Sequence, residues 1–419
     1  MLDRKTAPRH AEINSFHLPH PEIKQLSSGV PLFVVRGVTQ HVIKIELVFN
    51  AGKWVESKKG VSYFTSLMLE KGTTTKTSFE IADFFDRHGA SVEISTGLDF
   101  VSVSLFSLTK NIINIFPLFL ELVTSSVFPE DELTLQKDIF NQSLKINNEK
   151  TSYVASKLIR QHLFGNAHPY GSAIEEADVN HLRSEDLSGF FKNHFSLIQA
   201  FVVGSLEDHL VKFIISQLSV FPDDTKNQNS QHFAITPNES PEYLEKPGSI
   251  QSSLRLGKRG INRNHQDYPA LVLVNHIFGG YFGSRLMKNI REDKGLTYGI
   301  HSSLNNLKND AFFTIAADVN RINKDIALLE IKNELNRLCN KPASIQEIQN
   351  SKNHLLGSLQ LEIANPFSVI EKIKTIRLYG LNEDFYNNLF LNILDLDGST
   401  LQRVAIDCLA DNIIEVAVG

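Results

Sequence analysis

The order of helices and strands expected in the first half of this chain recurs in the second half. Each half begins with an apolar helix, continues with a second helix and alternating strands, and ends on an apolar strand. The helices that follow these strands are entered near Pro129 and Pro342, which lie 213 residues apart. The last strands end at Gly204 and Gly419, which lie 215 residues apart. This nearly constant offset predicts that one α/β unit has been duplicated. The matching segments are the apolar helices 61–69 and 268–278, the second helices 78–88 and 284–293, and the strands 100–105 and 311–316.

A segment with linker composition separates the two halves. Residues 222–249 hold four prolines among Asp, Asn, Gln and Ser and show no sustained periodicity, which is typical of a connection between domains. We therefore predict an N-terminal domain at 1–221, a linker at 222–249 and a C-terminal domain at 250–419. The length of 419 residues agrees with two or three domains of about 100–200 residues each.

Composition argues against several classes of protein. The hydrophobic share of 42% and the charged share of 21% are typical of a globular protein, and the net charge of −5 gives no sign of a nucleic-acid partner. Cys339 and Cys408 are too few for a disulfide framework and are expected to be buried thiols. The N-terminal residues have no apolar stretch and carry acids, so neither a secretory signal nor a transit peptide is expected there. No apolar run approaches the roughly 18 residues of a membrane helix. We predict a cytoplasmic protein without membrane contact.

One helical segment, residues 60–73, has the outline of a metal site without its ligands. It reads G-V-S-Y-F-T-S-L-M-L-E-K-G-T. It resembles the zinc helix of the insulinase/pitrilysin metallopeptidases, the inverzincins, whose H-x-x-E-H lies in a frame such as G-x-x-H-F-x-E-H-M-x-x-K-G-T. The two histidine positions are Tyr63 and Leu67 here, and the glutamate position is Ser66. The frame itself persists at Gly60, Phe64, Met68, Lys71, Gly72 and Thr73.

The replaced residues cannot perform zinc chemistry. Catalytic zinc needs three nitrogen or oxygen ligands and a bound water, and a carboxylate must take a proton from that water. In this family the third ligand is a Glu on a helix before H-P-Y-G, which is present at 168–171; the best alignment places Ser143 at that position. The resemblance therefore implies no metal or cofactor in this chain and no peptide hydrolysis by the chain alone.

Other catalytic motifs are not indicated by the sequence. It contains no H-E-x-x-H, H-x-x-E-H or G-x-S-x-G. His17 and His20 flank Pro19, which disfavours one helical turn and favours a surface pair. Residues 279–284 lack the G-K-[ST] ending of a phosphate loop and are expected to form a tight turn. The alternative interpretation of residues 61–68 is simply a buried helix face.

The second half carries a positive signal. Residues 279–303 read G-G-Y-F-G-S-R-L-M-K-N-I-R-E-D-K-G-L-T-Y-G-I-H-S-S. They are similar to the signature G-G-x-x-S-S-R-L…R-E-x-x-G-L-x-Y of the same family, which implies that Arg291 and Tyr298 steady the substrate and its oxyanion. We expect Arg291 near the end of a helix closed by Gly295, and Tyr298 at the start of the next strand. The alternative is structural: Arg291 can complement the helix dipole, and Tyr298 can be a half-buried strand aromatic.

The resemblance implies an architecture and a partner. The expected fold is α+β, with two homologous domains that each carry a mainly antiparallel sheet with helices on one side. One branch of the family, the processing-peptidase-like branch, assembles from two different chains, and this chain resembles the subunit without zinc. It is expected to bind peptide or unfolded polypeptide and to contribute Arg291 and Tyr298 in trans to a homologous zinc-bearing subunit. The alternatives are an inert structural core subunit and a homodimeric peptide-binding protein.

Overall fold

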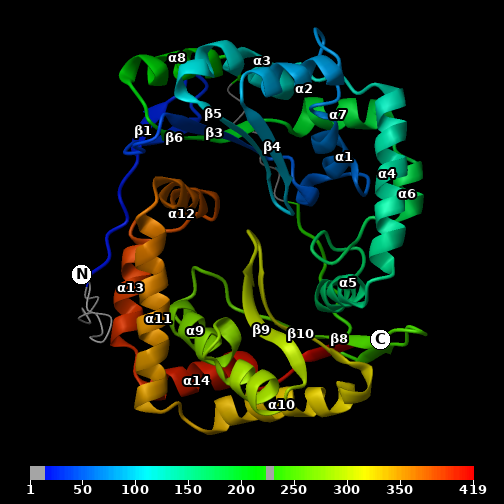
Figure 1. Cartoon of the computed structure of the whole chain (residues 1–419), viewed down its shortest axis with the longest axis vertical. Helices are drawn as coiled ribbons and strands as arrows, with labels where there is room; N and C mark the ends of the chain where they lie inside the picture. The colour runs from blue at the N-terminus through cyan, green and yellow to red at the C-terminus, as the bar shows by residue number, and fades with distance from the viewer. Residues whose placement is uncertain (1–14, 223–230) are drawn as a thin grey trace, which may run out of the picture.

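The computed structural model describes residues 15–222 and 231–419, which form two halves, each built on one β-sheet (Figure 1). The predicted fold class, α+β with two similar and mainly antiparallel sheets, is confirmed. The extreme N-terminus, 1–14, and part of the predicted linker, 223–230, lie outside the described residues.

The first sheet has six strands in the order β1-β2-β6-β3-β5-β4. Its β2 and β6 strands are parallel, and its other neighbours are antiparallel. These strands are β1 (Glu22–Gln25), β2 (Pro31–Val35), β3 (Val42–Phe49), β4 (Ser91–Thr96), β5 (Val101–Leu108) and β6 (Leu197–Gly204).

The second sheet repeats this plan without the first strand. Its order is β7-β11-β8-β10-β9, and here too the first pair is parallel and the other pairs are antiparallel. The strand order and directions therefore match β2-β6-β3-β5-β4, as a duplication requires. These strands are β7 (Glu242–Leu244), β8 (Gln251–Arg259), β9 (Thr297–Asn306), β10 (Ala311–Asn320) and β11 (Ile414–Val418).

Helices of each half cover the outer face of its own sheet (Figure 1). The helices of the first half are α1 (Val61–Met68), α2 (Ser78–Arg87), α3 (Ile112–Thr124), α4 (Glu130–Asn148), α5 (Thr151–Phe164), α6 (Glu176–Asn180), α7 (Ser184–His194) and α8 (Asp208–Leu218). Those of the second half are α9 (Tyr268–Asn275), α10 (Lys324–Asn340), α11 (Ile345–Ile363), α12 (Pro366–Leu378), α13 (Phe385–Asp395) and α14 (Gly398–Leu409). Two π-helical turns, η3 (His276–Gly280) and η4 (Met287–Asp293), follow α9, and short 3-10 turns are η1 (Lys53–Val55), η2 (Thr109–Asn111) and η5 (Arg321–Asn323).

Each half also places one helix on the sheet of the other half. Helix α5 packs on β8 and β11 of the second sheet, and α12 packs on β6 and β2 of the first (Figure 1). Ile159 and Leu163 of α5 share an apolar cluster with Val416. Gly257 makes room for them, because a Cβ at this position would lie 3.1 Å from Cγ1 of Ile159. The two halves are therefore joined by burial of apolar side chains and not by the linker alone.

A buried carboxylate ties α12 to the centre of the first sheet. Glu46 of β3 is 3% exposed and accepts hydrogen bonds from Lys44 and from Lys374 of α12, each at 2.7 Å. Lys44 also donates to Glu371 of α12 at 2.7 Å. Burial favours the neutral carboxyl, but the ammonium groups of Lys374 and Lys44 outweigh it and lower the pKa of Glu46. The carboxylate is therefore charged at neutral pH and compensated within the joint.

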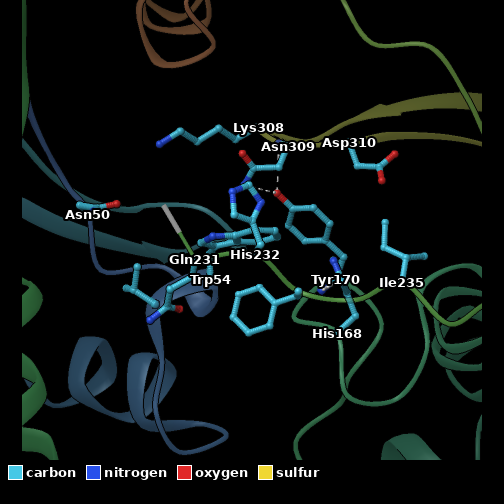
Figure 2. Close-up of a pocket in the computed structure, with 12 residues that line it drawn as sticks. Asn50, Trp54, His168, Tyr170, Gln231, His232, Ile235, Lys308, Asn309 and Asp310 are labelled. Atoms are coloured by element: carbon cyan, nitrogen blue, oxygen red, sulfur yellow. Dashed lines mark hydrogen bonds between the residues drawn. The ribbon is translucent and has the colours of Figure 1, made fainter. Parts of the chain in front are cut away.

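A second joint links turns of the two sheets. Tyr170, of the H-P-Y-G stretch, donates to Oδ1 of Asp99 in the β4–β5 turn at 2.6 Å. The other oxygen of Asp99 accepts from the backbone N–H of Lys308 in the β9–β10 turn at 3.0 Å. The backbone N–H of Asn309 donates to the Tyr170 hydroxyl at 3.3 Å. Figure 2 shows this contact beside a cavity of about 520 Å³ that Trp54, Tyr170 and residues of both halves line.

The predicted linker contributes to the second sheet. Strand β7 lies inside the range 222–249 and pairs in parallel with β11. Before it, the backbone N–H groups of Thr236 and Asn238 donate to carbonyl oxygens at the end of α5. The described part of this segment is thus built into the fold, and the domain boundaries at 221 and 250 stay a prediction.

Two further sequence expectations concern the cysteines and the membrane. Cys339 is buried as expected, whereas Cys408 is only half-buried, and burial raises the pKa of both thiols. Within residues 15–222 and 231–419, no helix is both long and apolar enough to cross a membrane. The cytoplasmic location stays a prediction.

The Glu46 joint predicts a specific loss of stability. Glu46→Gln should lower the free energy of unfolding by about 3 kcal/mol at neutral pH, because it leaves two lysines in a buried site with one carboxylate fewer. Glu371→Gln is the matched control: its side chain is 45% exposed, and its loss should be below about 1 kcal/mol. Urea unfolding followed by circular dichroism measures both variants.

The same joint should respond to acid. Because the folded protein lowers the pKa of Glu46, the stabilisation is present above the ordinary glutamate pKa and is lost as the pH falls through the lowered value. The difference between wild type and Glu46→Gln should therefore shrink below about pH 4. Equal losses for the Glu46 and Glu371 variants at neutral pH contradict this account of the joint.

Candidate functional site

The frame of the zinc helix is used for packing. Helix α1 follows Gly60, whose φ of +88° is left-handed, and Phe64 and Met68 are fully buried. Ser66, at the position of the catalytic glutamate, is also buried, and its hydroxyl donates to the carbonyl of Ser62 at 2.8 Å. Since this hydroxyl is engaged inside α1 and carries no carboxylate, Ser66 cannot serve as a general base.

An aromatic cluster surrounds the first ligand position. The ring of Tyr63 lies 5.4 Å from that of Phe64 and 5.3 Å from that of Phe140 in α4, and the rings of Phe64 and Phe140 are 5.4 Å apart. Burial raises the pKa of the Tyr63 phenol, so the hydroxyl keeps its proton at neutral pH. A neutral phenol packed against two phenylalanines is a poor zinc ligand.

The third ligand position is also unsuited to a metal. Ser143 is exposed on α4, and the α4 side chain in contact with Tyr63 is that of Phe140, three residues earlier. Leu67, at the second histidine position, is half-buried in the apolar core. The residues present do not fit a zinc ion. No group of three or more His, Cys, Asp or Glu side chains in the described chain is arranged to hold one.

Because the ligand positions of the zinc frame are used for packing, zinc should have little effect on the stability of this chain. Adding one equivalent of zinc or excess EDTA to the purified chain should change Tm by less than about 1 °C, since a bound ion would stabilise the native state by mass action. Differential scanning fluorimetry measures Tm, and elemental analysis after dialysis measures bound zinc. Stoichiometric zinc, or a rise in Tm that EDTA reverses, contradicts the assignment of this frame to packing.

The second frame is the family signature at residues 279–303. It depends on two closely packed glycines, Gly279 and Gly283, and on two π-helical turns. Helix α9 runs directly into η3, which ends at Gly280. Gly279 is required by close packing, since a Cβ there would lie 2.6 Å from the hydroxyl oxygen of Ser302 in β9. At Gly283, where the family signature has Ser, a Cβ would lie 2.7 Å from the Tyr281 ring. Turns of the π type are rare and are often found at functional sites.

Helix α11 anchors this frame through three side-chain contacts. Arg285 donates two hydrogen bonds to the carboxylate of Glu347, at 2.7 and 2.9 Å. Nε2 of His276 lies 3.0 Å from Nδ1 of His354, and Tyr281 stacks on His276 with ring centres 4.5 Å apart. A third contact joins the Tyr281 hydroxyl to Ser351 at 3.3 Å. The turn between η3 and η4 is therefore held in one conformation.

Arg291 lies in η4, close to its end. Gly295, with a φ of +62°, donates to the Arg291 carbonyl at 3.2 Å and closes the turn as the sequence predicts. The half-buried side chain of Arg291 places its guanidinium 5.1 Å from the centre of the Phe282 ring. Within the described residues it has no carboxylate within ion-pair distance and no hydrogen bond.

Tyr298 is the second residue of β9 and is 92% exposed, so the half-buried strand aromatic considered above is not what the structure has. No hydrogen bond or ring contact joins Tyr298 to Arg291 in the part of the chain that the structure describes. The sequence placed both residues on the correct elements, but their convergence on one substrate stays a prediction.

The sequence did not reveal two aromatic residues, Phe140 beside the zinc helix and Phe282 beside Arg291. Phe140 was passed over because the family pattern drew attention to Ser143, and its only signal was its position in an apolar helix face. Phe282 was passed over because the signature leaves its position unspecified. The histidine pair is as expected: His17 and His20 are exposed, with ring centres 5.7 Å apart.

Profiles of known protein families match both halves of the chain. A family profile described as insulinase (peptidase family M16) matches residues 33–177, and one described as the peptidase M16 inactive domain matches residues 181–355. The chain belongs to the insulinase, or M16 peptidase, family. Within this family it is a homologue whose zinc motif has been replaced at Tyr63, Ser66 and Leu67.

Individual insulinase relatives span most of the chain. A protein named uncharacterized zinc protease YmxG from Bacillus subtilis is 24% identical over 82% of this chain and 85% of its own length. The non-peptidase homolog YmxG of Helicobacter pylori is 24% identical over 81% of this chain and 80% of its own length. A crystal structure of a peptidase M16 inactive domain from Pseudomonas fluorescens is 23% identical and has a TM-score of 0.86 over 95% of this chain and 98% of its own.

The His276 contact predicts an acid-sensitive frame. Burial, with a smaller effect of neighbouring His354, lowers the pKa of His276 to about 4. Its neutral form therefore stabilises the fold above the ordinary histidine pKa of about 6.5, and this contribution is lost as the pH falls toward 4. When the pH is lowered from 7 to 5, the free energy of unfolding should fall less in His276→Gln than in wild type. Urea unfolding at both pH values measures this difference. An unchanged pH dependence in this variant contradicts the burial of a neutral His276.

Proposed function

We propose that this chain is a non-catalytic member of the insulinase family that binds extended polypeptide at the surface of Arg291 and Tyr298. The observation that carries the proposal is the contrast between the two frames. In the first, the ligand positions are filled by a packed aromatic cluster and an internally bonded serine. In the second, a guanidinium without a carboxylate partner in the described chain lies in η4, which follows the turn that α11 anchors through Arg285.

The chemistry of the second frame suits a peptide backbone. Arg291 offers five N–H donors in a fixed plane, and Tyr298 offers a hydroxyl. A peptide carbonyl accepts such donors, and hydrogen bonds to a charged group contribute about 1.5–3 kcal/mol each. Because Arg291 lies in η4 and Tyr298 lies in β9, which pairs with β10, regular structure fixes the backbone of both residues and little further ordering of it is required when a ligand binds.

A finer form of the proposal adds a zinc-bearing homologue as partner. In it, this chain docks on that homologue and contributes Arg291 and Tyr298 to a peptide bond that the partner hydrolyses. A guanidinium at Arg291 that has no carboxylate partner among the described residues supports this form over a purely structural subunit. The coarser form of the proposal is peptide binding by this chain without a catalytic partner. The names of the relatives, which include a non-peptidase homologue, support it.

Binding tests the coarser form. Fluorescence polarisation with fluorescein-labelled β-casein, an unfolded polypeptide, should detect binding by the purified chain. Arg291→Ala should lower the affinity for β-casein about tenfold, because a charged donor is lost. Tyr298→Phe should lower it about threefold, because a neutral donor is lost. Arg87→Ala is the control, since Arg87 is an exposed arginine on α2. Absence of binding, or full affinity in Arg291→Ala, contradicts the proposal.

Reconstitution tests the finer form. The chain is mixed with zinc and the H-x-x-E-H homologue from the same genome, and cleavage of β-casein is followed by mass spectrometry. Cleavage should require both chains and fall about tenfold or more with Arg291→Ala, as for other oxyanion donors. Full activity of the zinc-bearing chain by itself, or cleavage by this chain unaided, excludes the finer form and leaves the coarser one standing.

A further inference from the structure

Phe282 is exposed at the tip of a turn that is otherwise tightly packed. Its side chain is 59% exposed, whereas the neighbouring Tyr281 folds back over Gly283 and stacks on His276. The turn thus directs one aromatic ring inward and the next outward. A single exposed apolar residue is common on protein surfaces, so the exposure of Phe282 gains meaning only from what its ring contacts.

Phe282 is also the one partner that the described structure gives to the Arg291 guanidinium, 5.1 Å from its ring centre. Arginines in similar settings are neutralised by acids: Arg285 pairs with Glu347, and Arg403 with Asp267. A ring face attracts a guanidinium without neutralising its charge or occupying all of its donors. Such a contact favours one direction of the Arg291 side chain and leaves N–H groups for an acceptor.

We propose that Phe282 positions Arg291 for a peptide carbonyl and that the exposed part of its ring binds a large apolar side chain of the same polypeptide. This inference rests on the proposed function and adds a substrate class to it. The ligand is an extended segment in which an apolar or aromatic residue lies beside the carbonyl that Arg291 binds. Phe282 acts through Arg291 and through contact, and it takes no part in bond making or breaking.

The positioning role can be tested on the isolated chain without any ligand. In protein labelled with [15N]arginine, the Nε–Hε signal of Arg291, assigned by its loss in Arg291→Lys, should carry a ring-current shift. Phe282→Ser should abolish that shift, and Phe282→Tyr should retain it. Phe79→Leu is the control, since Phe79 is 77% exposed on α2 and should leave the signal in place. An Arg291 signal that does not move in Phe282→Ser overturns the positioning role.

The substrate class is tested with two fluorescein-labelled peptides that are identical except for a central Phe or Ser. Wild type should prefer the Phe peptide about fivefold, from partial burial of one apolar side chain. Phe282→Ser should remove this preference, and Phe282→Tyr should retain it. Arg291→Ala should lower the affinity for both peptides. Melting curves verify that each variant is folded.

The outcomes separate this inference from the proposed function. If wild type binds both peptides equally and binding depends on Arg291, the proposed function stands and the apolar contact is wrong. If wild type binds neither peptide, the proposed function and the apolar contact both fail, and the arginine signal still decides whether Phe282 holds Arg291.

Discussion

The packing of one helix from each half on the sheet of the other half is the constraint on which the rest of this structure depends. Helix α5 covers β8 and β11, and α12 covers β2 and β6. These helices bury apolar faces of the two sheets that would otherwise be open to water. They also place the segments after α5, including Tyr170, against the β9–β10 turn. The distance between the two candidate frames is therefore set by core packing.

The fold could be predicted because its signals are local. Alternation along β5 and β10, helical periodicity in α1 and the glycines at 204 and 419 each act over a few residues. The joints could not be predicted, because they link residues far apart in sequence. Lys44 and Glu46 alternate with apolar residues in β3 and look like the solvent side of a strand. In the structure they face α12, where Lys374 and Glu371 complete the ionic network.

The candidate site was predictable to the same limited degree. A family pattern placed Arg291 at the end of a helical segment and Tyr298 at the start of a strand, and the structure agrees. The pattern could not show that Tyr298 is almost fully exposed or that Arg291 stacks on Phe282, since neither follows from spacing along the chain. The family alignment places Ser143 at the third ligand position, which stays a prediction; it could not show that Ser143 is exposed on α4 or that Phe140 makes the contact with Tyr63.

The aromatic cluster at the former zinc position has a consequence for how this chain can evolve. A histidine at position 63 would lie against Phe64 and Phe140 with no second ligand to share a metal, so its packing loss would bring no compensating bond. A glutamate at 66 would introduce a charge into the buried face of α1, and a histidine at 67 would replace a half-buried apolar side chain. Each single reversion is thus unfavourable until the others are present. Restoring the metal site therefore requires changes at several positions together, because no single one of them supplies the three ligands and the base that catalytic zinc needs.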